Sequence, residues 1–211
     1  MTNKFLDILK EKKYLIADGA TGSTLQQRGL GKGTMAETWV LENPKAIYQL
    51  HCDFIDAGAE ILLTCTFGAN RFRLLNVGLA EKVKEINQRA VQIAREAVSD
   101  RQIFVAESLG PLGQMLKPFG VIDWEQAYQA YAEQAQALAE IDVDLLVIET
   151  QFDIQEASAA IQGVQSVCKI PVVCSFSFDR GTKTMMGISP TKMVQALADF
   201  NLVAMGINCG K

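Results

Sequence analysis

Residues Leu145-Leu146-Val147-Ile148-Glu149-Thr150 set the architecture expected for this chain. Four consecutive apolar residues, rather than an alternating pattern, are typical of a parallel strand that is covered on both faces. Glu149 closes this strand, and an isolated carboxylate there is costly unless it meets a cation, a proton or hydrogen-bond donors. We therefore expect Glu149 to have a function, such as binding a substrate ammonium, with a structural salt bridge as the alternative.

Similar apolar segments recur along the chain and alternate with amphipathic ones. The predicted strands are 14–17, 60–64, 102–106, 144–148, 171–176 and 202–205. Helices are expected between them, and residues typical of helix starts precede several of these helices: Asn43-Pro44, Asp123 with Gln126, Asp153 and Ser189-Pro190. Six strand–helix units without a change in composition predict one α/β domain over residues 1–211.

Polar residues come directly after the predicted strands. They are Asp18, Thr64 to Thr66, Glu107-Ser108, Glu149-Thr150, Ser175, Ser177 and Asn208-Cys209. Functional groups at the ends of many strands favour a (β/α)8 barrel of the TIM type, whose active site collects all the βα loops. A doubly wound sheet instead binds ligands at one switch point. Because a complete barrel has eight strands and about 250 residues, we expect about six of the eight strand–helix units, with the domain truncated before the last two strands.

Composition excludes several classes of protein. The chain has 211 residues, 49% of them hydrophobic, and a net charge of −4, so no basic surface indicates binding to nucleic acid. The apolar runs are shorter than the roughly 20 residues of a membrane helix, and the charged N-terminus lacks the apolar core of a signal peptide. A cytoplasmic protein without membrane or nucleic-acid partners is the expectation.

Histidine and cysteine usage narrows the possible chemistry. His51 is the single histidine, which leaves little room for a Ser-His-Asp relay or a multi-histidine metal site; we expect it to pack, with its hydrogen bonds satisfied, on the apolar side of a helix. The five cysteines are widely spaced and odd in number, so a disulfide framework is not expected. Cys52 and Cys168 are interpreted as small core residues, whereas Cys65 and Cys174 stay open.

The segment Asp18-Gly19-Ala20-Thr21-Gly22-Ser23 follows the first predicted strand. A carboxylate there can pair with a substrate amine, and the glycines allow backbone N–H groups to approach an anion closely. A tight turn in which Asp18 accepts from local N–H groups is the alternative. The segment alone supports both interpretations equally.

Cys209 lies at the end of the last predicted strand, within Gly206-Ile207-Asn208-Cys209-Gly210. A thiol in that position is a candidate metal ligand or nucleophile. A catalytic zinc site needs three protein ligands and one open position, so Cys209 alone cannot form one. Convergence of Cys65, Cys174 and Cys209 on one metal would require a geometric coincidence.

Taken in order, the segments of this chain resemble the homocysteine S-methyltransferase family, which includes the homocysteine-binding domain of cobalamin-dependent methionine synthase. The matching segments are 17–22, 56–60, 64–70, 108–113, 148–150 with Glu156, and 206–209. They run from about residue 14 to the end of the chain, which corresponds to the N-terminal portion of that domain. Cys65 is a departure, because relatives often carry Asn there.

The resemblance implies a (β/α)8 barrel that binds homocysteine and zinc at the carboxyl ends of its strands. It implies that Asp18 and Glu149 hold the homocysteine ammonium, and that the segment from Gly19 through Ala20, Thr21 and Gly22 to Ser23 lies near its carboxylate. Cys209 would be the first of three zinc cysteines. The other two, an adjacent pair in a Gly-Gly-Cys-Cys segment, are expected beyond Lys211.

The function implied is zinc-dependent transfer of a methyl group to the homocysteine thiolate, giving methionine. The methyl donor stays open, with cobalamin on another domain as one possible methyl carrier. Further domains of a longer chain, or self-association through open sheet edges, are the other partners considered. The alternatives are a catalytically incomplete fragment or pseudo-enzyme that acts as a thiol-binding or interaction module, and another barrel enzyme that acts on a small amino acid.

Overall fold

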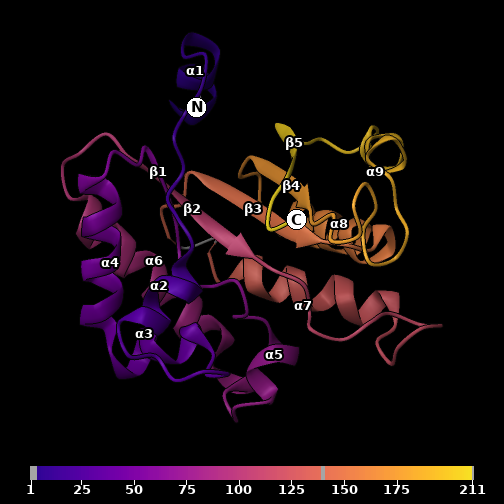
Figure 1. The fold of residues 1–211 in the computed structure, drawn as a ribbon, viewed down its shortest axis with the longest axis horizontal. Coiled ribbons are helices and arrows are strands. Elements are labelled where there is room, and N and C mark those ends of the chain that lie inside the picture. Colours follow the sequence, from indigo (N-terminus) through magenta and orange to yellow (C-terminus); the bar gives the residue numbers. More distant parts are fainter. Residues whose placement is uncertain (1–3, 139–140, 211) are drawn as a thin grey trace.

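The computed structural model describes residues 4–138 and 141–210 of the chain. Within these residues, five parallel strands form one sheet in sequence order (Figure 1). The strands are β1 (Ile61–Leu63), β2 (Phe104–Leu109), β3 (Leu145–Gln151), β4 (Val172–Phe176) and β5 (Ala204–Ile207). Each strand pairs with the next along the chain, as in a (β/α)8 barrel, and the order does not reverse as it does in a doubly wound sheet.

The first predicted strand, 14–17, is not a strand in the structure. Ala17 makes one isolated parallel bridge to Ile61, and the Asp18 N–H donates to the Ile61 carbonyl at 2.9 Å. Tyr14 and Ile16 are 70% and 51% exposed. The segment therefore runs beside the start of β1 but makes too few ladder hydrogen bonds to count as a strand, so five of the six predicted strands are present in the described residues.

Two strands are longer than predicted. The prediction ended the third strand at residue 106 and the fourth at residue 148, whereas the corresponding strands of the structure, β2 and β3, continue to Leu109 and Gln151. Glu107, Ser108, Glu149 and Thr150 consequently lie inside strands rather than after them. Because side chains alternate along a strand, adjacent residues of these extensions point to opposite faces of the sheet.

The helices of the described chain are α1 (Lys4–Glu11), α2 (Thr21–Gln27), α3 (Trp39–Glu42), α4 (Pro44–Asp56), α5 (Arg71–Leu75), α6 (Val83–Val98), α7 (Trp124–Gln136), α8 (Ile154–Val167) and α9 (Pro190–Leu197), with 3-10 turns η1 (Ala36–Thr38) and η2 (Ala80–Lys82). The four helices for which the sequence showed start signals, α4, α7, α8 and α9, begin where predicted. Asp153 accepts from the Gln155 N–H at 2.9 Å, and Ser189 from the Lys192 N–H at 3.3 Å. Helix α7 ends at Gln136.

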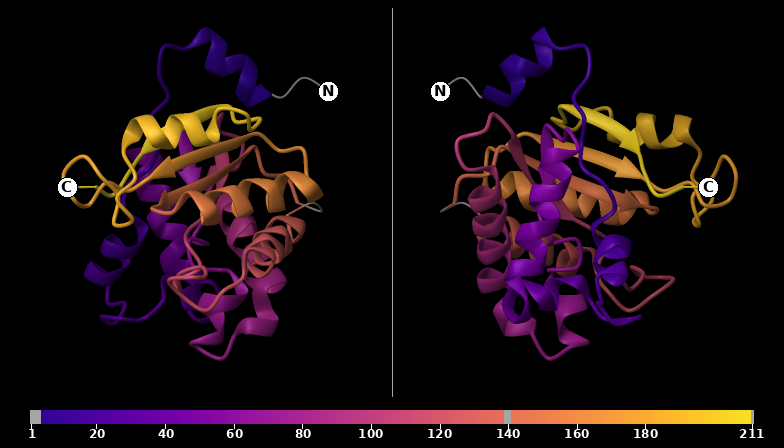
Figure 2. Two further views of the ribbon diagram at one scale, coloured as in Figure 1. Left: turned by 90° about the vertical axis from the view of Figure 1, so that its right-hand side faces the viewer. Right: turned by 60° about the vertical axis from the view of Figure 1, so that its left-hand side comes forward.

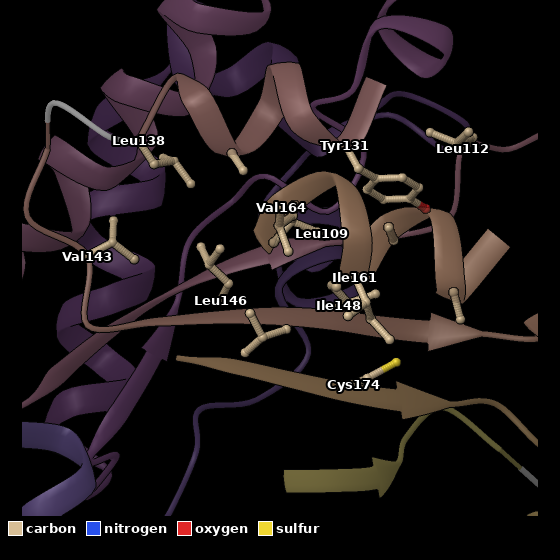
Figure 3. Packing of buried hydrophobic residues seen from close by; sticks show 14 of the residues in the cluster. Leu109, Leu112, Tyr131, Leu138, Val143, Leu146, Ile148, Ile161, Val164 and Cys174 are labelled. Atoms are coloured by element: carbon tan, nitrogen blue, oxygen red, sulfur yellow. The ribbon is translucent and has the colours of Figure 1, made fainter. Parts of the chain in front are cut away.

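The sheet has two faces that differ in their cover (Figure 2). On one face, here called the outer face, the sheet packs on α7 and α8 through buried side chains that include Leu109, Leu146 and Ile148 (Figure 3). On the other, the inner face, α1 covers the amino ends of the strands. Its Phe5 ring meets the Phe104 ring edge to face at 5.2 Å. None of the helices in the described ranges combines the length and apolar character that a membrane crossing requires.

His51 lies fully buried in α4 among apolar side chains, as expected. The expected hydrogen bonds are absent, because neither ring nitrogen has a partner among the described residues. This burial lowers the pKa of His51 to about 4, so the ring is neutral at physiological pH. All five cysteines are free. Cys52 and Cys168, predicted as core residues, are half-buried.

Candidate functional site

A cleft of about 970 Å³ runs along the inner face of the sheet, from α1 at the amino ends of the strands to their carboxyl ends. Its lining includes most of the residues that the sequence singled out: Asp18, Gly19, Ala20, Thr21, Gly22, Glu149 and Cys209. Ser23 is the exception, because it does not line the cleft and its hydroxyl donates to the Ala20 carbonyl at 3.4 Å. Segments that are far apart in the sequence thus meet in one hollow.

Asp18 enters the cleft from the segment that runs beside β1. Its Oδ2 accepts the Leu63 N–H at 2.9 Å, which fixes the carboxyl against the end of β1. Burial raises the pKa of Asp18 to about 7; the Leu63 N–H opposes the rise and the nearby Glu149 adds to it. At neutral pH this carboxyl is therefore close to half protonated.

Glu149 projects from β3 into the same cleft. Its Oε1 accepts a hydrogen bond from the Ser108 hydroxyl, and its Oε2 accepts from Asn208 Nδ2 at 2.9 Å. Burial raises the pKa of Glu149, and the Ser108 hydroxyl opposes the rise. No lysine or arginine in residues 4–138 and 141–210 forms a salt bridge with Asp18 or Glu149. The structural salt bridge considered for Glu149 is therefore absent from the described chain.

Asn208 joins the ends of three strands, a role that the sequence did not reveal. Its Oδ1 accepts from the Thr150 N–H at 2.9 Å and from the Ser175 hydroxyl at 2.8 Å. Its Nδ2 lies 2.9 Å from Glu149 Oε2 and 2.8 Å from Thr150 Oγ1. This side chain therefore fixes Glu149 relative to β4 and β5. Its position at a strand end, beside Cys209, is the signal that could have identified it.

Two residues at the cleft have left-handed backbone conformations. Thr150 has φ of 59° and Cys209 has φ of 52°. Such values are uncommon for residues other than glycine and are outliers for a β-branched residue such as threonine. They cost about 1–3 kcal/mol each and concentrate at functional sites, where the surrounding structure holds them in place. The hydrogen bond from the Thr150 N–H to Asn208 is part of that support.

The thiols do not form a metal site by themselves. Cys209 is exposed at the cleft. Cys174 belongs to the core on the outer face, so its side chain points away from the cleft (Figure 3). Cys65 lines the cleft but is completely buried, which raises its pKa well above the usual value. In the described part of the chain, no group of three or more His, Cys, Asp or Glu residues could hold a metal ion. Cys209 alone does not fit zinc, which takes three protein ligands in a catalytic site.

Glu156, at the start of α8, supports the loop after β2. Its Oε1 accepts from the Leu112 N–H at 2.7 Å and from the Tyr131 hydroxyl at 2.9 Å. Tyr131 also donates to the Gly110 carbonyl at 3.0 Å. Burial raises the pKa of Glu156 to about 7. This carboxyl supports the loop after β2 and does not line the cleft.

Glu107, which the sequence analysis placed after a strand among the candidate functional groups, is a buried carboxyl inside β2. It lies between Val105 and Leu109 in β2 and shares their outer face, so it points away from the cleft. Its Oε2 accepts from the Thr64 hydroxyl at 2.9 Å, while Oε1 has no partner among the described residues. Complete burial raises its pKa to about 8, with the hydroxyls of Thr64 and Thr66 opposing the rise. Glu107 is therefore mainly protonated at neutral pH.

Comparison with known sequences identifies the family. The family model for homocysteine S-methyltransferase matches residues 15–211. Methionine synthase of Mycobacterium tuberculosis is 26% identical over 220 residues, which cover 97% of this chain. Methionine synthase of Mycobacterium leprae is 26% identical over 214 residues, which cover 94% of this chain. The chain spans 18% of the length of both curated relatives.

Solved structures agree with the sequence relatives. The metallated form of MmuM, a homocysteine methyltransferase of Escherichia coli, superposes with a TM-score of 0.82 at 26% identity, covering 96% of this chain and 77% of MmuM. The oxidized form of MmuM gives a TM-score of 0.84 at 25% identity and the same 77% coverage of MmuM. The five-stranded sheet is thus part of a TIM barrel, as predicted. The chain belongs to the homocysteine S-methyltransferase family.

Proposed function

We propose that this chain binds homocysteine in the inner-face cleft as part of a zinc-dependent homocysteine S-methyltransferase. The observation that carries the proposal is the pair formed by Asp18 and Glu149. These two half-buried carboxyls face one cleft and have no cationic partner in the described chain; burial raises the pKa of both, and the nearby Glu149 raises that of Asp18 further. An α-ammonium group supplies the missing positive charge and accounts for two carboxyls at one site.

The surroundings of this pair suit the rest of an amino acid. Gly19 to Gly22 line the cleft next to Asp18, and we assign their backbone N–H groups to the substrate carboxylate. Asn208 and Ser108 hold Glu149 in position for the ammonium. With the amino-acid end fixed in this way, the homocysteine side chain extends into the part of the cleft that Cys209 lines.

Cys209 is proposed as one zinc ligand, with the remaining ligands coming from outside the described residues. The described chain supplies a single candidate ligand, so the steps assigned here rest on its own side chains. Asp18 and Glu149 bind and orient the ammonium, and Asn208 positions Glu149. In the transfer, the homocysteine sulfur forms a bond to the methyl carbon as that carbon leaves the donor. The thiol proton passes to solvent, and the product is methionine.

Calorimetric titration of homocysteine tests the proposal. Asp18→Asn and Glu149→Gln each remove one charge that faces the ammonium, so each is expected to weaken binding by about 10- to 100-fold. Glu107→Gln is the matched control, because it neutralises a buried carboxyl in the neighbouring strand that does not line the cleft. Equal affinity for homocysteine in the wild type and in both site variants would contradict the proposal.

A second candidate function is a thiol-binding module without methyl transfer. The absence of a three-ligand metal group from the described residues favours it. The number of zinc ions bound per chain, and the methyl-transfer activity with each candidate donor, distinguish the two candidate functions. Tight homocysteine binding without zinc and without turnover supports the module, whereas zinc-dependent turnover supports the enzyme.

A further inference from the structure

Arg73 is close to two buried carboxyls that the proposed function does not use, Glu37 and Glu156. Burial raises the pKa of both carboxyls, and the positive charge of Arg73 opposes the rise in each. Within the described ranges the guanidinium forms no direct salt bridge with either of them. The attraction therefore acts across a short gap, where poor access of solvent keeps it strong.

The Arg73 side chain is fixed between the loop after β1 and the loop after β2. Its Nε lies 3.2 Å from the point that a Cβ atom on Gly68 would occupy, and its Cγ lies 3.3 Å from the corresponding point on Gly113. Its Nη1 donates to the Pro111 carbonyl in a long contact of 3.4 Å. A side chain on either glycine would crowd the arginine, so both positions leave space for it.

Each of the two carboxyls is bonded to one of these loops. Glu37 comes from η1, and its Oε1 accepts from the Gly68 N–H in the loop after β1. Glu156 comes from α8, and its Oε1 accepts from the Leu112 N–H at 2.7 Å in the loop after β2. Arg73 itself belongs to α5. One cation and two carboxyls therefore connect three helical segments with two loops at the carboxyl ends of the strands.

This charged group reaches the homocysteine cleft, because Glu37, Arg73 and Phe67 all line it. The Arg73 guanidinium lies 5.5 Å from the centre of the Phe67 ring, a distance at which a cation attracts an aromatic face. A Cβ atom on Gly110 would lie 2.5 Å from the same ring, so the ring packs on bare backbone there. The Phe67 ring is thus held in the wall of the cleft that Cys209 also lines.

We propose that Arg73 is a positioning residue for homocysteine binding, and that its attraction to Glu37 and Glu156 fixes the part of the cleft wall that contains Phe67. This inference rests on the proposed function, because homocysteine is the ligand whose affinity reports the position of the wall. A guanidinium suits this place better than an ammonium, since its planar face stacks on a ring while its edge donates hydrogen bonds.

Calorimetric titration of homocysteine into single and double variants tests the inference. Arg73→Met keeps the apolar stem without the charge and is expected to weaken binding by about 5- to 20-fold, and Glu37→Gln by about 2- to 5-fold. The double variant should bind no more weakly than Arg73→Met alone, because both substitutions break the same interaction. Losses that multiply in the double variant would show that Arg73 acts independently of Glu37, as it would by touching homocysteine itself, and would overturn the inference.

Urea unfolding separates positioning from damage to the fold. Arg73→Met leaves two buried carboxyls without their cation, so it should be less stable than the wild type. A triple variant that adds Glu37→Gln and Glu156→Gln removes the carboxyl charges as well and should regain stability. Its homocysteine affinity should stay low, because the cation that holds the wall is still missing. Recovery of affinity together with stability would show that Arg73 acts on the fold alone, and would overturn the inference.

Two further variants of α5 complete the test. Arg73→Lys keeps the charge without the planar group and should recover part of the affinity. Arg71→Gln is the matched control, because Arg71 pairs with Glu81 and Glu133 and does not line the cleft. Its homocysteine affinity should equal that of the wild type.

The same titrations distinguish the inference from the proposed function. Wild-type affinity in Arg73→Met, together with weak binding in Asp18→Asn and Glu149→Gln, refutes the positioning role and leaves the proposed function standing. A wild-type chain that does not bind homocysteine refutes the proposed function, and the inference that rests on it.

Discussion

The outer and inner faces of the sheet are built from the same strands but hold different kinds of side chain. Strand β3 shows the contrast within a few residues: Leu146 and Ile148 are completely buried on the outer face (Figure 3), whereas Val147 and Glu149 face the inner cleft and are half-buried. Because strand side chains alternate, one apolar run supplies both a packed core and a functional wall. Whether a residue of this strand contributes to stability or to the cleft therefore depends on the face to which its side chain points, and not on its position along the chain.

The largest effect expected from this contrast is on stability. Leu146→Ala on the outer face should lower the free energy of unfolding by about 3–4 kcal/mol, because it leaves a cavity against α7 and α8. Val147→Ala, one residue along and half-buried on the inner face, should cost about 1 kcal/mol or less, because there is less packing to lose. Urea unfolding of both variants measures the difference, and equal losses would remove the distinction between the faces.

Substitutions of the cleft carboxyls should change binding and stability in opposite directions. Asp18→Asn removes a carboxyl that burial keeps close to half protonated. Above pH 7 the wild type must hold this group ionised at a cost, so the variant should unfold at the same or a higher urea concentration while binding homocysteine about 10- to 100-fold less tightly. If Asp18→Asn instead lost both homocysteine affinity and stability, Asp18 would have a structural role, as the buried residues of the outer face do.

Glu107, on the outer face, should make the free energy of unfolding depend on pH. Its folded pKa of about 8 lies above the ordinary value of 4.5, so between these values the folded protein holds a proton that the unfolded chain has lost. Stability from this group is therefore present at low pH and lost as pH rises through about 8, by up to about 1.4 kcal/mol per pH unit. Glu107→Gln has no such proton, so its stability relative to wild type should increase with pH, as urea unfolding at pH 5, 7 and 9 would show.

A lack of any relative change with pH would mean that Glu107 ionises in the folded protein with an ordinary pKa.

The sequence predicted what depends on local chemistry. The starts of α4, α8 and α9 follow from Asn43-Pro44, Asp153 and Ser189-Pro190, because these signals act within one turn of a helix. The apolar runs located the five strands for the same reason. Asp18, Glu149 and Cys209 were found as cleft residues because polar groups at strand ends meet at one end of a barrel.

Features that depend on pairing between distant segments were not predictable from one sequence. Residues 14–17 look like a strand, but whether they form one depends on the ladder they make with β1. The length of β2 decides that Glu107 points outward while Ser108 points to the cleft, and the predicted strand ended before both. The contacts of Asn208 involve β3 and β4, each more than thirty residues away along the chain. The residue pattern of one sequence does not show which distant segments will be in contact.

The smallest expected effect is on the pH dependence of homocysteine binding. The ammonium pairs with ionised Asp18, whose pKa in the free protein is about 7, so affinity should fall by up to about tenfold between pH 7 and pH 6 as the carboxyl takes up a proton. Above about pH 8 the affinity should level off.

Asp18→Asn should bind weakly and with little pH dependence over this range, whereas Glu107→Gln on the outer face should keep the wild-type profile. Titrations at half-unit pH steps test this, and a flat wild-type profile would show that Asp18 is already ionised at pH 6. A profile that Glu107→Gln flattens would instead show that the outer face titrates together with the cleft, and the two faces would no longer be independent.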